Sequence, residues 1–324
     1  MDKGFTFDGA LMFPFRAAHA RSFPWKFALA MAIVSTVLTG VFLYLVRGLF
    51  FNLFDELEGL SGSGGDELER VFATLFRFFG QFAPWMVLSV AVSWVIWAMF
   101  TAATQRRYIF DEDFSLRFGP DELRMMGVGA IWYAAQSVVS IIPLILMAPI
   151  FTSLMGVDSG EITEEEFVRM IFGRMGLIML SMLVIMPFYI FFATRFSPVF
   201  AMTVKEGKIA FRDAWIVSRG RFWPILGAYL IIAIVGGMVV GFASSIAEMV
   251  LMPAFMSSPA ALEDMPDLHA VFTPAVMIGI LFYLFVRFFM SGLLVHFAQG
   301  PAAFAARHDP RGSIDDALKV TDFD

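Results

Sequence analysis

The chain has 324 residues, of which 59% are hydrophobic and 16% charged, and it contains 39 Phe and 22 Met. A soluble domain carries about 25% charged residues, so a mean hydropathy of +0.75 excludes an ordinary water-soluble globule. The absence of cysteine excludes disulfides, thiolate metal sites and cysteine nucleophiles, and at a formal net charge of −6 we expect no nucleic-acid partner.

Six apolar segments follow one another along the chain, each long enough to cross a bilayer, which takes about 20 residues. We expect spans at 27–46, 82–104, 127–149, 175–194, 223–243 and 273–296, followed by a tail at 297–324. The first segment exceeds the apolar core of a signal peptide and has no obvious cleavage site, so it is interpreted as a retained helix. The prediction is an all-α, polytopic membrane protein in which residues 1–324 form a single membrane domain.

Basic residues are distributed unevenly among the connections. The N-terminal segment, the connections after spans two and four, and the tail carry 17 of the 23 Lys and Arg residues. Because basic residues accumulate on the cytoplasmic side of a membrane, this distribution predicts that the N- and C-termini are both cytoplasmic.

The segments that precede the odd-numbered spans resemble one another. Each has two apolar residues four positions apart and then an arginine: Leu11, Phe15 and Arg21; Phe114, Phe118 and Arg124; Phe211, Trp215 and Arg221. Residues four apart share one helix face, a pattern typical of a helix lying at the membrane surface. We predict three pseudo-repeats, each an interfacial helix followed by a hairpin of spans. The alternative is that any inner membrane-entry segment carries an aromatic residue and an arginine.

The connection between the fourth and fifth spans carries a recognisable motif. Its residues are Arg195-Phe196-Ser197-Pro198, Glu206-Gly207-Lys208, Ala214-Trp215, Ser218-Arg219-Gly220 and Phe222-Trp223. The motif resembles the hallmark segment of a bacterial six-span membrane-domain family found beside, or fused to, glycerophosphodiester phosphodiesterases, and in related uncharacterised inner-membrane proteins. The resemblance implies a helical bundle in a bacterial plasma (inner) membrane. It does not imply phosphodiesterase activity, because no soluble, strand-rich segment is present to house that catalytic domain.

Arg287 interrupts the sixth span about 13 Å from its inner end, at 1.5 Å per residue. A charge at this depth costs at least about 2.5 kcal/mol on insertion scales, and no predicted span offers an Asp or Glu partner. Three explanations are open: the side chain snorkels inwards, it lies in a water-filled cavity, or it binds an anionic substrate or lipid headgroup. His296, further in, either joins such a site or is an interfacial residue.

Small and polar residues within the spans suggest contacts between helices. Gln136, Ser137 and Ser140 form a polar stripe in the third span, for which the hypotheses are interhelical hydrogen bonding and the lining of a cavity. Gly237 and Gly241 form a Gly-x3-Gly pair in the fifth span, which predicts close helix packing.

A cluster of basic residues surrounds the motif between spans four and five. Its members are Arg195, Lys205, Lys208, Arg212, Arg219 and Arg221. Basic residues near a membrane surface attract anionic headgroups at about 1 kcal/mol each, although the same residues could serve only to fix topology. We expect no metal, cofactor or catalytic residue, since zinc motifs, phosphate loops and nucleophile elbows are absent from the sequence.

These features favour a non-enzymatic function, either lipid handling and organisation or support of a partner complex. The expected partners are anionic membrane lipids and, secondly, another protein or a second copy of the chain. A transporter or channel for an anionic or amphiphilic solute is one alternative, with Arg287 and the stripe in the third span lining its route. A lipid-modifying membrane enzyme is the other.

Overall fold

The computed structural model describes residues 5–60, 67–158, 163–256 and 274–312. Throughout these ranges the ordered elements are helices, with no strand. Six are long and apolar enough to cross a membrane: α2 (Phe23–Leu60), α3 (Glu67–Phe110), α4 (Pro120–Asp158), α5 (Glu164–Phe196), α8 (Phe222–Met256) and α10 (Pro274–Ala298). The prediction of an all-α, multi-pass membrane protein is therefore confirmed.

The long helices extend beyond the predicted spans. α2 has 38 residues, which at 1.5 Å per residue is about 57 Å, whereas the hydrocarbon core of a bilayer is about 30 Å thick. α5 begins at a capping box in which the side chain of Thr163 accepts from the amide of Glu166 and the Glu166 carboxylate accepts from the amide of Thr163. The long helices therefore exceed the length that the hydrocarbon core requires.

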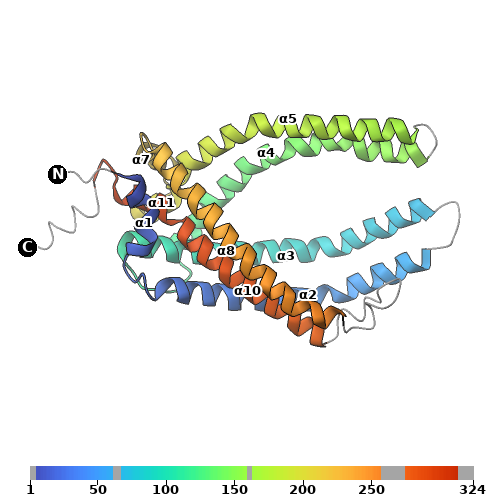
Figure 1. Cartoon of the computed structure of the whole chain (residues 1–324), viewed down its shortest axis with the longest axis horizontal. Helices are drawn as coiled ribbons and strands as arrows, with labels where there is room; N and C mark the ends of the chain where they lie inside the picture. The colour runs from blue at the N-terminus through green and yellow to red at the C-terminus, as the bar shows by residue number, and fades with distance from the viewer. Residues whose placement is uncertain (1–4, 61–66, 159–162, 257–273, 313–324) are drawn as a thin grey trace, which may run out of the picture.

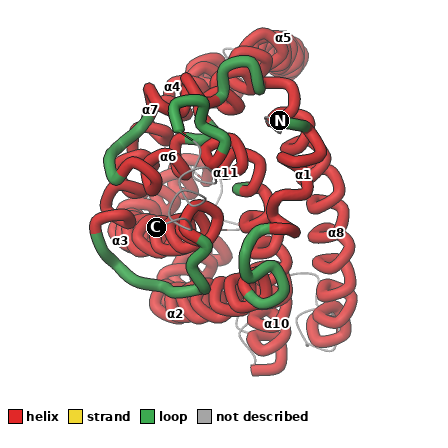
Figure 2. Tube along the Cα trace, turned by 90° about the vertical axis from the view of Figure 1, so that its left-hand side faces the viewer, coloured by secondary structure: helices red, strands yellow, loops and turns green. Residues whose placement is uncertain are grey.

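Four short helices gather at the end where α2, α4 and α8 begin and α3, α5 and α10 end (Figure 1). They are α1 (Phe7–Arg16), α6 (Val199–Glu206), α7 (Phe211–Val217) and α11 (Gly300–Arg307). We call this end of the molecule the base. Figure 2 looks onto the base and shows α1, α6, α7 and α11 among the ends of the long helices.

Three hairpins extend from the base: α2–α3, α4–α5 and α8–α10. Gly292 of α10 lies close to α2, since a Cβ at that position would be 3.2 Å from the Cα of Ala28. Gly236 of α8 lies against the side chain of Leu294 of α10. In contrast, α4 and α5 run apart from the other hairpins (Figure 1), and none of their most apolar stretches is buried within the described part of the chain.

The three predicted interfacial helices are reduced to two. α1 precedes α2 and α7 precedes α8, but the segment before α4 is non-helical from 111 to 118. There Asp111 adopts a left-handed φ of 56°, the carboxylate of Asp113 accepts a hydrogen bond from the amide of Phe114, and Phe114 packs on Phe23 and Phe27. Local turn bonds and the aromatic contacts therefore replace a helix in the middle repeat.

The predicted cytoplasmic tail begins with a buried helix. Ala302, Ala303, Ala305 and Ala306 of α11 are all buried, at 0–3% exposure. Gly300 lies against the ring of Pro14, so α11 packs directly on α1. Residues 313–324 of the predicted tail lie outside the described residues.

A buried ion pair joins α3 to α4 within the base. Arg106 donates to Glu122 at 2.6 Å, and both side chains are 1% exposed. Glu112 and Asp121 lie further from the same guanidinium, at 3.5 and 4.0 Å. Breaking a buried pair leaves an uncompensated charge in a low-dielectric interior, which is strongly destabilising.

We expect Glu122→Gln to lower the free energy of unfolding by about 3 kcal/mol, measured by chemical denaturation in detergent micelles. Glu56→Gln is the control: its pair with Arg77, at 3.2 Å, is 44–62% exposed, and an exposed pair contributes about 1 kcal/mol or less. Equal losses for the two variants would contradict the assignment of the Arg106–Glu122 pair as the stabilising one.

Candidate functional site

α1 forms a wall between two cavities. The helix begins at Thr6, whose hydroxyl accepts a hydrogen bond from the amide of Gly9 at 3.0 Å, and ends with an extended residue, Ala17. One side of α1 carries Leu11, Met12 and Phe15, and the other carries polar and small residues. Because apolar and polar residues alternate at helical spacing, α1 presents an apolar face to the spans and a polar face to the end of the base.

The apolar face of α1 closes a groove between α8 and α10. The groove has a volume of about 370 Å³ and no polar surface. Its lining residues are Leu11, Met12, Phe15, Ile231, Ile232, Val235, Gly236, Val239, Val240, Met290, Leu293, Leu294 and Phe297. Phe15 and Phe297 stack with their ring centroids 4.7 Å apart. Two membrane-spanning helices and one short helix therefore enclose a wholly apolar space.

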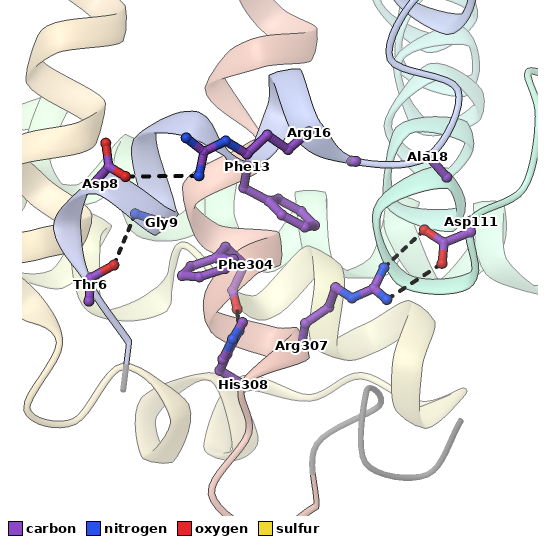
Figure 3. Close-up of a pocket in the computed structure, with 11 residues that line it drawn as sticks. Thr6, Asp8, Gly9, Phe13, Arg16, Ala18, Asp111, Phe304, Arg307 and His308 are labelled. Atoms are coloured by element: carbon purple, nitrogen blue, oxygen red, sulfur yellow. Dashed lines mark hydrogen bonds and ion pairs between the residues drawn. The ribbon is translucent and has the colours of Figure 1, made fainter. Parts of the chain in front are cut away.

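The polar face of α1 lines a larger cavity, of about 690 Å³ (Figure 3). Its charged groups are already paired: Arg307 donates to both carboxylate oxygens of Asp111, at 3.0 and 3.5 Å, and Arg16 lies 3.9 Å from Asp8. The lining thus holds equal numbers of arginine and aspartate side chains. It shows no excess charge that would select an ionic ligand.

His296 is fully buried and belongs to the base. Its Nε2 accepts a hydrogen bond from the guanidinium of Arg107, and Tyr108 donates to the His296 carbonyl at 3.0 Å. Arg107 also donates to the carbonyls of Ala18 at 2.7 Å and Pro14 at 3.2 Å, which fixes the end of α1 and the turn that follows it. His296 is therefore held within the base by Arg107 and Tyr108, and its assignment to the membrane interface or to a site with Arg287 stays a prediction.

Arg287 has an exposed side chain on α10. Its guanidinium donates to the hydroxyl of Tyr283 at 2.9 Å, and within the described ranges no carboxylate lies within ion-pair distance of it. Arg287 lines neither of the two cavities described above, so they give no support to the water-filled-cavity explanation. Tyr283 lies one turn towards the start of α10, so the side chain is directed away from the base, opposite to the expected inward snorkelling.

The predicted basic cluster is divided among several contacts. Lys205 donates to Asp309 at 3.2 Å and to the carbonyl of Gly312 at 3.0 Å, and Arg221 donates to the carbonyl of Ala305 at 3.3 Å. These two side chains therefore hold the end of the described chain against the base.

The other four members of the cluster differ in exposure. Arg195 is 8% exposed and lies over the ring of Trp215 at 4.3 Å, and Lys208 lies 3.9 Å from Asp213. Lys208, Arg212 and Arg219 are all exposed, which leaves these three best placed to meet anionic headgroups.

The polar stripe of the third predicted span makes bonds within its own helix. Ser137 donates to the carbonyl of Tyr133 at 2.8 Å and Ser140 to that of Gln136 at 3.2 Å, and both serines are exposed. The structure thus shows these serines bonded neither across helices nor in a described cavity.

The close helix contact predicted for the glycine pair of the fifth span is made by a neighbouring glycine instead. Gly237 and Gly241 face open space, and Gly236 is the glycine of α8 that contacts α10.

The residues that organise the base are not apparent from the sequence alone. Arg106 and Arg107 lie among the basic residues of the connection after the second span, and Glu122, Arg307 and Asp309 belong to no motif. The adjacent arginines at the end of the second span are the one indication of this network in the sequence, because two neighbouring cations there need acidic or carbonyl partners. In the described part of the chain, no group of three or more His, Asp or Glu residues is placed to hold a metal ion.

Comparison with protein-family models, curated proteins and solved structures found no match.

The Asp309 carboxylate connects three segments of the base. It accepts from Lys205 of α6 at 3.2 Å and from Arg311 at 2.8 Å, while Arg311 also donates to Asp213 of α7. Burial acts to raise the pKa of Asp309, but the hydrogen bonds from Arg311 and Lys205 outweigh it and hold that pKa below the usual value. The charged form is therefore favoured in the folded protein.

A carboxylate whose pKa is lowered on folding stabilises the folded protein at pH values above its unfolded pKa, about 3.9. This stabilisation is lost as the pH falls through the folded pKa. We expect Asp309→Asn to accelerate backbone hydrogen exchange of residues 303–312 at pH 7. In the wild type the same residues should lose protection only below about pH 4, after correction for intrinsic rates. Asp8→Asn, at the exposed pair with Arg16, is the control and should leave this segment protected. Unchanged exchange in Asp309→Asn would contradict the role of this carboxylate.

Proposed function

We propose that this chain is a non-enzymatic membrane protein that binds a membrane lipid, with an acyl chain in the groove between α1, α8 and α10. The observation that carries the proposal is the wholly apolar lining of this groove, about 370 Å³ in volume. Apolar surface is stabilised by contact with hydrocarbon rather than water, at about 25 cal/mol per Å². An acyl chain is the hydrocarbon that a membrane supplies.

The position of α1 supports a lipid at the membrane surface. α1 holds its apolar face, with Leu11, Met12 and Phe15, against two spans at the base. A short helix that lies across the ends of the spans with its apolar face on them is typical of the membrane surface. The lipid would then have its headgroup at the base, beside α1, and one chain between α8 and α10.

The membrane is proposed to be the plasma (inner) membrane of a bacterium, with the base on the cytoplasmic side. The excess of Lys and Arg in the connections at the base supports this orientation, and the resemblance of the segment 195–223 to the six-span family supports the bacterial assignment. α4 and α5 leave long apolar surfaces outside the bundle. A protein partner, or a second copy of the chain, is proposed to cover part of them.

A transporter whose route combines Arg287 with the polar stripe of α4 has weaker support. Arg287 lies on the hairpin α8–α10, whereas Gln136, Ser137 and Ser140 lie on the separate hairpin α4–α5. The lipid-binding proposal needs only side chains that the structure places around one space.

Filling the groove should reduce lipid binding. We expect Val235→Trp to lower photo-crosslinking by a phospholipid with a photoactivatable acyl chain roughly tenfold, because displacing two methylenes removes about 0.8 kcal/mol each. Crosslinks in the wild type should fall within residues 231–240 and 290–297.

Met238→Trp is the matched control, since Met238 is 71% exposed on the same helix and does not line the groove. If the two tryptophan variants crosslink equally, or if wild-type crosslinks avoid both segments, the groove does not bind lipid.

The orientation is tested with reporters active on one side of the membrane only. A reporter fused after Asp324 should be active in the cytoplasm, and one inserted within residues 61–65 should be active outside it. Activity of both reporters on the same side would overturn the six-span topology and the cytoplasmic assignment of the base.

A further inference from the structure

Arg287 is a membrane-exposed charge near the middle of a span. At 1.5 Å per residue it lies about 20 Å from Pro274 and about 17 Å from Ala298, the two ends of α10. Charged residues at such depth in lipid are stabilised by snorkelling, by local thinning of the bilayer and by water defects, or they mark a pathway for a charged species. Its contact with Tyr283 uses one nitrogen of a guanidinium that has five N–H donors.

The same face of α10 carries both the charge and the groove. Tyr283, Arg287, Met290 and Leu294 follow one another at spacings of four, three and four residues, which places them along one side of a helix. Met290 and Leu294 line the apolar groove. Seven residues separate Arg287 from Leu294, so the charge lies about 10 Å along the helix from the interior of the groove.

We propose that Arg287 is an intermediate binding position for the anionic headgroup of a phospholipid that crosses the bilayer beside α10, and that the protein thereby exchanges anionic phospholipid between the two leaflets. This inference rests on the proposed lipid-binding function of the groove. A guanidinium binds a phosphate through paired, charge-assisted hydrogen bonds, which offsets the cost of bringing the phosphate into hydrocarbon. The apolar groove accommodates an acyl chain while the headgroup is at Arg287.

Charge selectivity follows from this arrangement. Within the described residues no carboxylate pairs with Arg287, so its positive charge is available to a diffusing anion. Phosphatidylglycerol carries a net negative charge and phosphatidylcholine carries none. The protein should therefore exchange phosphatidylglycerol between the leaflets faster than phosphatidylcholine.

A matched control exists on another hairpin. Arg47 of α2 also lies against a tyrosine, with its guanidinium carbon 3.6 Å from the ring centroid of Tyr44 and its Nη1 donating to the Tyr44 carbonyl at 3.0 Å. Arg47 does not line the groove. Removing it tests whether any arginine beside a span would give the same effect.

The experiment uses the full-length protein in vesicles of phosphatidylcholine and phosphatidylglycerol, with a trace of either lipid labelled on an acyl chain by a fluorophore. Dithionite added outside the vesicles reduces only the outer-leaflet label, so loss of the protected fluorescence reports exchange between leaflets. We expect wild-type protein to exchange labelled phosphatidylglycerol well above the rate in protein-free vesicles and faster than phosphatidylcholine. Arg287→Ala should lower the phosphatidylglycerol rate roughly tenfold or more, whereas Arg287→Lys, which keeps the charge but not the paired hydrogen bonds, should give a rate between those of the wild type and Arg287→Ala.

Arg47→Ala should exchange phosphatidylglycerol at the wild-type rate, and a size-exclusion profile like that of the wild type establishes that each variant is folded. Wild-type exchange no faster than in protein-free vesicles, or an unchanged rate in Arg287→Ala, would overturn the inference. Acyl-chain crosslinking in the groove is measured on the same samples. Crosslinking without exchange would leave lipid binding in place and reject exchange, whereas loss of both would reject the proposed function itself.

Discussion

The guanidinium of Arg107 is buried where α3, α10 and the end of α1 meet. A buried cation is tolerated only when its donors are satisfied, and here they bond to His296 and to the carbonyls of Pro14 and Ala18. The ring centroids of Phe23 and Tyr108 lie 5.0 and 5.1 Å from the guanidinium carbon of Arg107. Since α1 is held by these contacts, the groove on one side of α1 and the polar cavity on its other side both depend on this one side chain.

The hairpins contribute unequally to the bundle. α10 packs between α2 and α8 through Gly292 and Gly236, where small residues allow close approach of the helices. α4 contacts α3, where Gly129 lies against the ring of Trp97 and Tyr133 packs on Trp94, but the most apolar stretches of α4 and α5 are not buried by the described chain. In a membrane, apolar surfaces of this kind meet acyl chains or other helices.

Basic residues at the base have two functions at once. Their number on this side of the spans is a topology signal, yet Arg106, Lys205 and Arg307 are occupied by Glu122, Asp309 and Asp111. A count of charges cannot distinguish a residue that attracts headgroups from one that joins two helices. Of the six basic residues predicted to meet headgroups, Lys208, Arg212 and Arg219 are exposed in the structure, whereas the other three are partly or fully buried.

The six spans and the all-α class follow from the amino-acid sequence, because the apolar length needed to cross a bilayer is a local property of each segment. The sequence also located Arg287, since a charge within an apolar run is visible without a structure. Only the tertiary structure buried His296 beside Arg107, 189 positions away in the sequence, and set α1 against α8 and α10 to form the groove. These features depend on contacts between distant segments, and neither periodicity nor composition specifies which segments meet.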